Sequence, residues 1–218
     1  MDKPQRVLIA DDHFFVRQGL KSVLVENFPK LVIGDVEDGQ SALKAIWSGN
    51  WDVLLLDISM PGRGGLETLK DVKQAKPLLP VIILSMHAED QFAIRSLKAG
   101  ACAYIRKDNA ATELVKAVHH ALKGERYITA SLAEKLASHV QDDRSGVPHE
   151  DLSDREYQVM CLLASGKTVK EVGAILSLSV KTISTYRTRI LEKLDLKNNA
   201  QIMVYAHKHR LIDSESAA

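Results

Sequence analysis

The sequence predicts a chain in two parts, an α/β domain built on a parallel sheet and a smaller all-helical domain after it. Residues 6–124 alternate short aliphatic runs with amphipathic stretches of helix length, a pattern typical of buried parallel strands joined by helices. From residue 151 onward no strand pattern occurs, and four short helices fit the remaining sequence. A length of 218 residues is enough for two domains.

Five strands and five helices are expected in the first part. The strands are continuous apolar runs, as expected of strands covered on both faces, at 6–10, 31–36, 52–56, 80–84 and 102–106. A helix follows each strand, at 13–26, 39–48, 65–75, 89–99 and 110–123. Such repeated units imply right-handed crossovers and helices on both faces of the sheet. Gly49, Gly100 and Gly124 follow three of the helices, where we expect left-handed C-terminal caps.

The second part begins after a connecting segment. A further helix is predicted at 129–140, because Leu132, Leu136 and Val140 recur every four residues. Residues 141–150 are polar and contain Gly and Pro, which is typical of a linker. Four helices then fit at 154–165, 168–176, 180–194 and 199–209. The predicted division is a first domain at 1–125, a linker at 126–150 and a second domain at 151–218.

Composition narrows the class of protein. The content of 45% hydrophobic and 26% charged residues is that of an ordinary globular protein. Residues 151–218 carry ten Lys or Arg and eight Asp or Glu, so any surface for nucleic acid must be local. Cys102 and Cys161 lie in apolar surroundings without metal-ligand spacing, which indicates buried free thiols in a reducing compartment. No apolar run approaches the roughly 20 residues of a membrane span, and no secretory stretch follows Met1. We therefore expect a cytoplasmic protein that does not bind a membrane.

Polar side chains follow four of the predicted strands. Asp11 and Asp12 follow the first strand, Asp57 the third, Ser85 the fourth and Lys107 the fifth. In an open parallel sheet, ligands bind at the carboxyl ends of the strands. Three carboxylates, one hydroxyl and one ammonium at one edge suit a divalent cation and a phosphoryl group.

Each of these residues has a simpler interpretation. Asp11 could cap the next helix, Ser85 could do the same, and Lys107 could be a solvated charge. The five residues together favour the phosphoryl site. Mg²⁺ is usually bound by one or two carboxylates together with phosphate oxygens and water. Asp12 and Asp57 could supply the carboxylates, and Asp11 could act through a bound water. A carboxylate can also attack phosphorus to form an aspartyl phosphate, while Lys107 neutralises a phosphoryl oxygen and Ser85 hydrogen-bonds another.

Residues 6–124 resemble the receiver domain of two-component response regulators. The resemblance rests on Asp11-Asp12, on Asp57 followed by Ile58-Ser59-Met60-Pro61-Gly62, on Ser85 and on Lys107. It implies a flavodoxin-like fold with strand order 2-1-3-4-5. It also implies phosphorylation of Asp57, and binding of Mg²⁺ by Asp11, Asp12, Asp57 and the main-chain carbonyl of Ser59.

The same resemblance gives roles to three further positions. Tyr104, three residues before Lys107, corresponds to a switch aromatic that turns inward as Ser85 moves toward the phosphate. The alternative is a packed, half-buried strand aromatic. Ser59 and His87 correspond to positions that tune the lifetime of the phosphate. We expect His87 to slow autodephosphorylation, because a protonated imidazole cannot accept and orient water as a carboxylate does.

The expected helix at 180–194 has a basic, hydroxyl-rich face. Ile183, Ile190, Leu191 and Leu194 gather on one side, and Lys181, Ser184, Thr185, Thr188 and Arg189 on another. With the preceding helix and its short connection, this fits a helix-turn-helix, in which cations reach phosphates and hydroxyls touch base edges. From composition alone, a solvated amphipathic helix has equal weight.

Residues 152–212 resemble the LuxR-type four-helix DNA-binding domain. The matching segments are Leu152-Ser153-Asp154-Arg155-Glu156, Ala164-Ser165-Gly166-Lys167, Glu171-Val172, Leu176-Ser177-Leu178-Ser179, Lys181-Thr182-Ile183 and Lys193-Leu194. The resemblance implies that Ser184, Thr185 and Thr188 face bases, and that Lys181, Arg187, Arg189 and Lys193 are candidates for backbone contacts. Tyr186 and Asn199 stand where the family commonly has His and Arg, so their roles stay open. The last helix resembles a dimerisation element, with packing inside one domain as the alternative.

A receiver joined to this domain identifies the chain as a member of the NarL/FixJ subfamily. Membership implies a transcription regulator whose only enzymatic steps are Mg²⁺-dependent self-phosphorylation from a phosphodonor and autodephosphorylation. Its implied partners are a cognate histidine kinase, DNA with two half-sites roughly one turn apart, and a second copy of the chain when phosphorylated. RNA polymerase is a further candidate partner.

Two alternatives remain. One is a phosphatase using Asp57 as nucleophile, but haloacid-dehalogenase-like enzymes normally have a second Asp two residues on as general acid, where this chain has Ser59. A protein that binds only other proteins is disfavoured by the basic face at 181–193, and salt-dependent DNA binding would separate the two.

Overall fold

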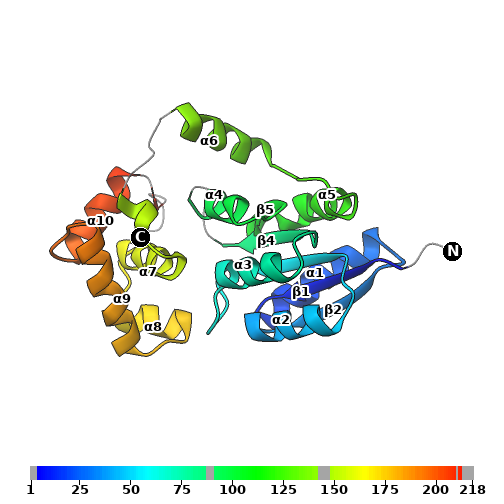
Figure 1. Ribbon diagram of the computed structural model, residues 1–218, viewed down its shortest axis with the longest axis horizontal. Helices are drawn as coiled ribbons and strands as arrows, with labels where there is room; N and C mark the ends of the chain where they lie inside the picture. The colour runs from blue at the N-terminus through cyan, green and yellow to red at the C-terminus, as the bar shows by residue number, and fades with distance from the viewer. Residues whose placement is uncertain (1–3, 87–90, 142–147, 210, 213–218) are drawn as a thin grey trace. The chain divides into compact units, whose positions relative to one another are not determined.

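Two compact units, Met1–Ala137 and Ser138–Ala218, make up the chain in the computed structural model of Figure 1. The structure describes residues 4–86, 91–141, 148–209 and 211–212. No helix within these ranges is long and apolar enough to cross a membrane.

A five-stranded parallel sheet forms the centre of the first unit. Its order is β2-β1-β3-β4-β5, which confirms the expected flavodoxin-like arrangement. The strands are β1 (Arg6–Ala10), β2 (Val32–Val36), β3 (Val53–Asp57), β4 (Val81–Ser85) and β5 (Ala103–Arg106). Every residue of β3 and β4 is buried, because both faces of the sheet are covered.

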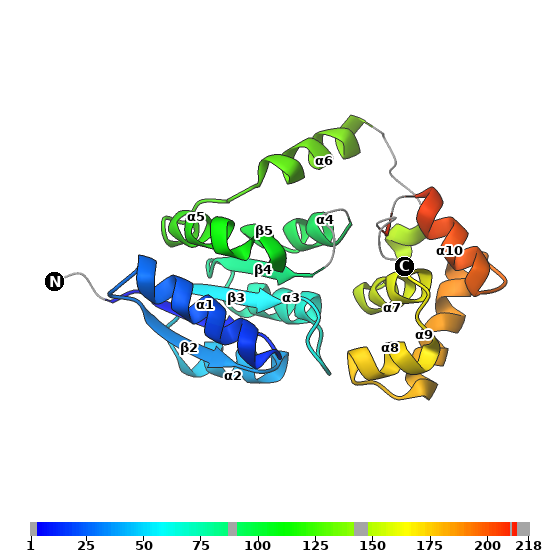
Figure 2. The same ribbon diagram turned by 180° about the vertical axis from the view of Figure 1, so that it is seen from behind.

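Five helices cover this sheet in two layers. They are α1 (Phe14–Asn27), α2 (Gly39–Ser48), α3 (Gly65–Ala75), α4 (Gln91–Lys98) and α5 (Ala110–Leu122), the last preceded by a 3-10 turn, η1 (Lys107–Asn109). Helices α1 and α5 pack on one face, and α2, α3 and α4 on the other (Figures 1 and 2). On the α1/α5 face, Leu20, Leu24 and Leu114 pack against alternate residues of the strands.

The predicted glycine caps are confirmed at two of three positions. Gly100 has a φ of 98° and Gly124 a φ of 76°, the left-handed conformation expected after a helix. The prediction for Gly49 is wrong, since its φ is −123°. A Cβ there would lie 2.7 Å from Trp51 Nε1, which donates a hydrogen bond to the Ala45 carbonyl at 2.9 Å. Close approach of the indole, not backbone handedness, favours glycine here.

Helix α6 (Ala130–Gln141) lies in the segment predicted to be a linker. It spans the division between the two compact units, so the domain boundaries given above stay predictions. Both cysteines are buried thiols, as predicted.

Four helices follow a short 3-10 turn, η2 (Pro148–Asp151), in the second unit. They are α7 (Asp154–Ala164), α8 (Val169–Leu176), α9 (Val180–Lys193) and α10 (Asn199–Lys208). Each begins at a residue whose side chain accepts a hydrogen bond from the first turn: Ser153, Thr168, Ser179 and Asn198. Reciprocal capping boxes with Glu156 and Glu171 strengthen the starts of α7 and α8. Local sequence therefore fixes where each helix begins.

Candidate functional site

An ion-pair cluster lies at the carboxyl edge of the sheet. Asp11 follows β1, Asp57 ends β3, and Lys107 follows β5. Lys107 Nζ lies 2.7 Å from Asp11 Oδ2 and 2.9 Å from Asp57 Oδ2. The side chains of Asp11, Asp57 and Lys107 are 0%, 1% and 7% exposed, so the alternative of a solvated Lys107 is wrong.

Asp11 does not cap α1. The N-cap residue is His13, and it makes no side-chain capping bond. Asp11 Oδ1 instead accepts a hydrogen bond from the His13 main-chain N–H at 2.8 Å, within the loop between β1 and α1. The second oxygen of the Asp11 carboxylate faces Lys107, so this side chain links the loop to the ion-pair cluster.

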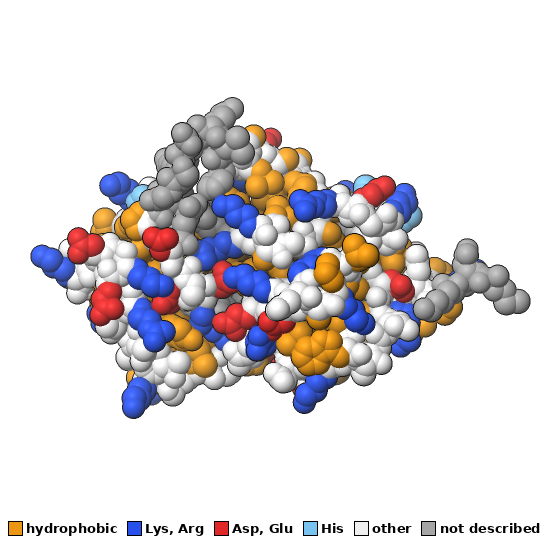
Figure 3. Space-filling model, viewed as in Figure 1, with side chains coloured by type: hydrophobic (Ala, Val, Ile, Leu, Met, Phe, Trp, Pro, Cys, Tyr) orange, Lys and Arg blue, Asp and Glu red, His pale blue; other side chains and the backbone are white. Residues whose placement is uncertain are grey.

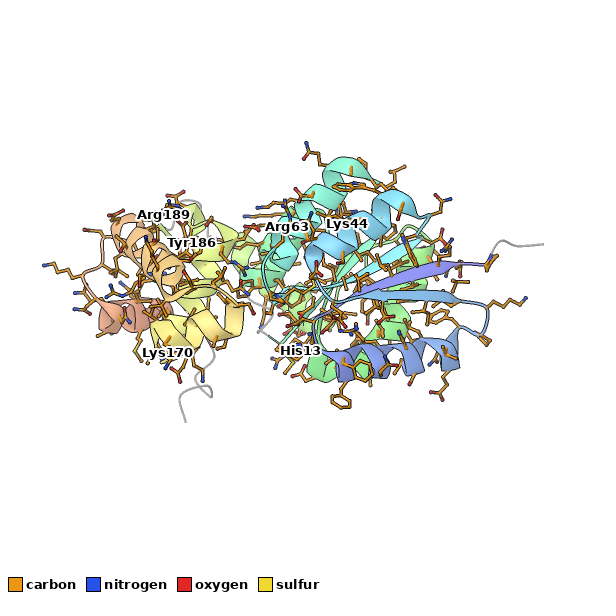
Figure 4. The ribbon with its side chains drawn as sticks, turned by 90° about the horizontal axis from the view of Figure 1, so that it is seen from below. His13, Lys44, Arg63, Lys170, Tyr186 and Arg189 are labelled. Atoms are coloured by element: carbon orange, nitrogen blue, oxygen red, sulfur yellow. The ribbon has the colours of Figure 1, made fainter. Side chains whose placement is uncertain are left out.

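His13 joins the acidic residues, and the sequence prediction missed it. Ligand atoms of Asp11, Asp12, His13 and Asp57 all lie within 4.8 Å of one another. His13 Nδ1 is 2.8 Å from Asp12 Oδ1 and 3.5 Å from Asp11 Oδ1. Figure 4 shows His13 at the start of α1. Its position directly after the acid pair was the available signal.

This set of groups fits a hard divalent cation. Three carboxylates meet one ammonium, which leaves two negative charges in excess when His13 is neutral. The Ser59 N–H donates to Asp57 Oδ1 at 3.2 Å, so the main chain of Ser59 lies beside the Asp57 carboxylate. Mg²⁺ prefers such oxygen ligands and commonly keeps several waters. Asp11, Asp12 and Asp57 are the residues that could hold it.

Burial and charge oppose each other at this edge. Burial raises the pKa of Asp57, and the Lys107 ammonium counteracts part of that rise. Burial on its own would lower the pKa of Lys107, but the carboxylates of Asp57 and Asp11 raise it overall. Lys107 therefore stays protonated at neutral pH.

Ser85 and Tyr104 are both inside the receiver-like unit. Ser85 ends β4 and is fully buried at the same edge of the sheet. The Tyr104 ring in β5 is also fully buried rather than half-buried, with its main chain in register with Ile83. The role of Tyr104 as a switch stays a prediction. Ser59 is half-buried, whereas His87 lies outside the described residues.

The seven predicted DNA contacts divide into two groups on α9. The exposed group is Lys181, Ser184, Thr185, Thr188 and Arg189. The other two, half-buried Arg187 and exposed Lys193, have partners in the same unit. Arg187 Nε donates to Asn199 Oδ1 at 2.5 Å, and Lys193 Nζ lies 2.7 Å from Glu156 Oε2. Figure 4 shows Arg189 and Tyr186 on this helix.

The hydroxyls of the exposed group donate hydrogen bonds to their own helix. Ser184, Thr185 and Thr188 each donate to the carbonyl four residues earlier, at 2.8, 3.0 and 3.1 Å. Because each hydroxyl hydrogen is already donated, the three oxygens can only accept further hydrogen bonds. The two threonines also present methyl groups. Such a surface can accept from exocyclic amino groups of bases or contact thymine methyls. On the face shown in Figure 3, acidic and basic side chains are interspersed.

Helix α10 has an inner and an outer face. Ile202 and Ala206 are fully buried, which supports packing within one domain. Met203 and Val204 on the same helix are exposed. The role of this helix as a dimerisation element stays a prediction.

Comparison with known proteins gives matches over both units. Residues 7–119 match the family model described as response regulator receiver domain, and residues 150–206 match bacterial regulatory proteins, luxR family. The response regulator UvrY of Escherichia coli K12 is 33% identical over 211 residues, covering 96% of this chain and 97% of UvrY. The transcriptional regulatory protein LiaR of Bacillus subtilis is 35% identical over 209 residues, covering 95% and 99%.

A solved structure is similar over nearly the whole chain. RcsB from Salmonella enterica serovar Typhimurium, bound to a promoter in the presence of the phosphomimetic BeF3⁻, has a TM-score of 0.64 and 29% identity. The match covers 93% of this chain and 98% of the RcsB chain.

Proposed function

The chain belongs to the NarL/FixJ-type two-component response regulators, with a receiver and a LuxR-type DNA-binding domain, and from this premise we propose that phosphorylation of Asp57 switches it. One observation carries the proposal. Lys107 contacts Asp57 and Asp11 at once, in a buried cluster at the carboxyl ends of three strands. No other arrangement among the described residues pairs a buried carboxylate with both an ammonium and a divalent-cation ligand set.

The Asp57 carboxylate is the proposed nucleophile. One of its oxygens attacks the phosphorus of a phosphohistidine or a small acyl phosphate, and the O–P bond forms as the donor's bond to phosphorus breaks. The electron pair of the broken bond leaves with the donor. Bound Mg²⁺, held by Asp11, Asp12, Asp57 and the Ser59 carbonyl, would supply charge neutralisation for the phosphoryl oxygens.

Lys107 and Ser85 act on the transferred group. The Lys107 ammonium, already 2.9 Å from Asp57 Oδ2, hydrogen-bonds one phosphoryl oxygen. The buried Ser85 hydroxyl, at the end of the neighbouring strand, turns to another, while Tyr104 fills the space that this movement leaves. Phosphorylation shifts the population of receiver states because these contacts exist in only one of them.

The output of the switch is DNA binding. We propose a cognate histidine kinase as phosphodonor, DNA with two half-sites as target, and a second copy of the chain as partner after phosphorylation. RNA polymerase is the further proposed partner. The RcsB structure with promoter and BeF3⁻ supports this coupling by similarity. The chain acts on no separate substrate, and its chemistry is limited to gain and loss of its own phosphoryl group.

The proposed division follows the two families. Residues 1–125 are the receiver, 126–150 the linker and 151–218 the DNA-binding domain. The family matches at 7–119 and 150–206 support these limits.

Labelling with acetyl phosphate carrying ³²P tests the proposal. The wild-type chain should take up label only with Mg²⁺ present, and the label should be lost at alkaline pH, as expected of an acyl phosphate. Asp57→Asn should take up none. Equal labelling of Asp57→Asn would overturn the assignment of the phosphorylated residue.

A further inference from the structure

Arg17 is a buried cation that the proposed chemistry leaves without a role. It lies in the first turn of α1 and is 3% exposed. Arginine is almost never buried at this level unless its charge is paired. Its guanidinium has three partners within hydrogen-bond distance, one directly after β1 and two in or directly after β2.

The three hydrogen bonds join the acid-pair loop to β2. Arg17 Nη1 donates to the main-chain carbonyl of Asp11 at 2.7 Å. Nε donates to Asp35 Oδ2 at 3.1 Å, and Nη2 donates to Glu37 Oε1 at 2.7 Å. The planar guanidinium presents its N–H donors at fixed angles to one another, an arrangement called the fork below. Its three partners are therefore held in a fixed relative position. Asp35 lies in β2 and Glu37 directly follows it.

We propose that Arg17 is a positioning residue for Mg²⁺ binding, because its guanidinium fixes the Asp11 carbonyl and thereby sets the direction of the Asp11 and Asp12 carboxylates. This inference rests on the proposed function. Two other hydrogen bonds hold the same loop. The Asp11 N–H donates to the Val36 carbonyl at 3.2 Å, and the His13 N–H donates to Asp11 Oδ1 at 2.8 Å. The Arg17 bond holds the carbonyl of the peptide unit between Asp11 and Asp12.

The contribution of Arg17 is geometric rather than electrostatic. Asp35 and Glu37 balance the charges of Arg17 and of Lys21, whose Nζ lies 2.6 Å from Asp35 Oδ1. This group of four side chains is neutral as a whole, so it adds little net field at the metal ligands. Lysine at position 17 would preserve the charge but could not replace the three-way fork.

Lys21 provides the matched control. It pairs with the same carboxylate of Asp35, but no hydrogen bond joins it to Asp11 among the bonds described. Lys21→Met therefore removes an ion pair to β2 and leaves the fork in place. Glu37 provides a second variant, because its side chain is 74% exposed and its truncation takes only one of the three partners from the Arg17 guanidinium.

The experiment measures the Mg²⁺ dissociation constant of the full chain by isothermal titration calorimetry. It compares wild type, Arg17→Lys, Lys21→Met and Glu37→Ala at a temperature where circular dichroism shows each to be folded. Removing a residue that orients metal ligands typically weakens affinity about 10- to 100-fold, which is the range expected for Arg17→Lys. Glu37→Ala should weaken affinity less, and Lys21→Met should leave it unchanged.

Three outcomes would overturn the inference. Wild-type affinity in Arg17→Lys, or equal weakening in Lys21→Met, would show that Arg17 acts on stability or on charge alone. If Arg17→Lys fails to fold, a wild-type Mg²⁺ affinity of Glu37→Ala would contradict the claim that the three hydrogen bonds of Arg17 position the metal ligands. Absence of Mg²⁺ binding by the wild-type chain would instead overturn the proposed function, and this inference with it.

Discussion

Replacing Lys107 with methionine should destabilise the receiver far more than replacing an exposed lysine. The change removes the ammonium between Asp11 and Asp57, both of which are almost completely buried. Removing one partner of a buried pair costs about 3–5 kcal/mol, because the remaining charges lose their compensation. Lys116→Met is the control. Lys116 is 60% exposed and pairs with Glu113 at 3.2 Å, so its loss should cost at most about 1 kcal/mol.

Urea unfolding followed by circular dichroism measures both free energies. The loss of unfolding free energy caused by Lys107→Met should increase as the pH rises. Burial already raises the pKa of Asp57, and removal of Lys107 takes away the largest influence that opposes this rise. A carboxyl whose folded-state pKa is raised favours folding at low pH, so the variant should lose stability as pH rises through that value. Mg²⁺ should restore part of the loss, about 2.7 kcal/mol at 100 times its dissociation constant. Equal costs for Lys107→Met and Lys116→Met at pH 7 would refute this account of the cluster.

Three further predictions concern the DNA-binding unit and the phosphate lifetime. Glu156→Gln should cost the second unit about 1.5–3 kcal/mol in urea unfolding, because the buried Glu156 carboxylate accepts charged and capping hydrogen bonds from Lys193 and Ser153. Burial alone would raise the pKa of Glu156, but those bonds lower it below 4.5. The stability that the Glu156 carboxylate contributes should therefore be lost only as the pH falls through that lowered pKa. A destabilisation by Glu156→Gln that persists below that pKa would contradict this role of the carboxylate. Arg189→Ala should weaken DNA binding and reduce by about one the slope of log affinity against log salt concentration. Lys170→Ala on α8 is the control and should change neither quantity. His87→Glu should shorten the half-life of the aspartyl phosphate in a decay assay, and an unchanged half-life would remove His87 from the mechanism.

The sequence was sufficient for the sheet and its polar edge because both are local signals. Asp57 ends an uninterrupted aliphatic run, and that boundary is the end of β3 itself. The same holds for Ser85 at the end of β4. Parallel strands then bring their carboxyl ends together, so the order of residues along the chain implied their meeting at one edge.

Contacts between distant residues were beyond the same reasoning. Arg17 donates hydrogen bonds to Asp35 and Glu37, which are 18 and 20 residues away. No periodic pattern in the sequence predicts that pairing. Lys193 is a predicted contact to the DNA backbone, and the sequence did not indicate that its ammonium also pairs with Glu156, 37 residues earlier. Gly49 does not adopt the predicted left-handed conformation, and a Cβ at this position would meet the Trp51 ring. In each case the deciding neighbour is set by tertiary packing.

The affinity for DNA with and without a phosphomimetic tests the central claim most directly. A duplex selected by the wild-type chain from a random pool serves as probe, and fluorescence anisotropy measures its dissociation constant with and without beryllofluoride and Mg²⁺. We predict tighter binding of the treated wild-type chain and no change for Asp57→Ala. The same tightening in Asp57→Ala, or none in a wild-type chain shown to carry beryllofluoride, would contradict a switch at Asp57.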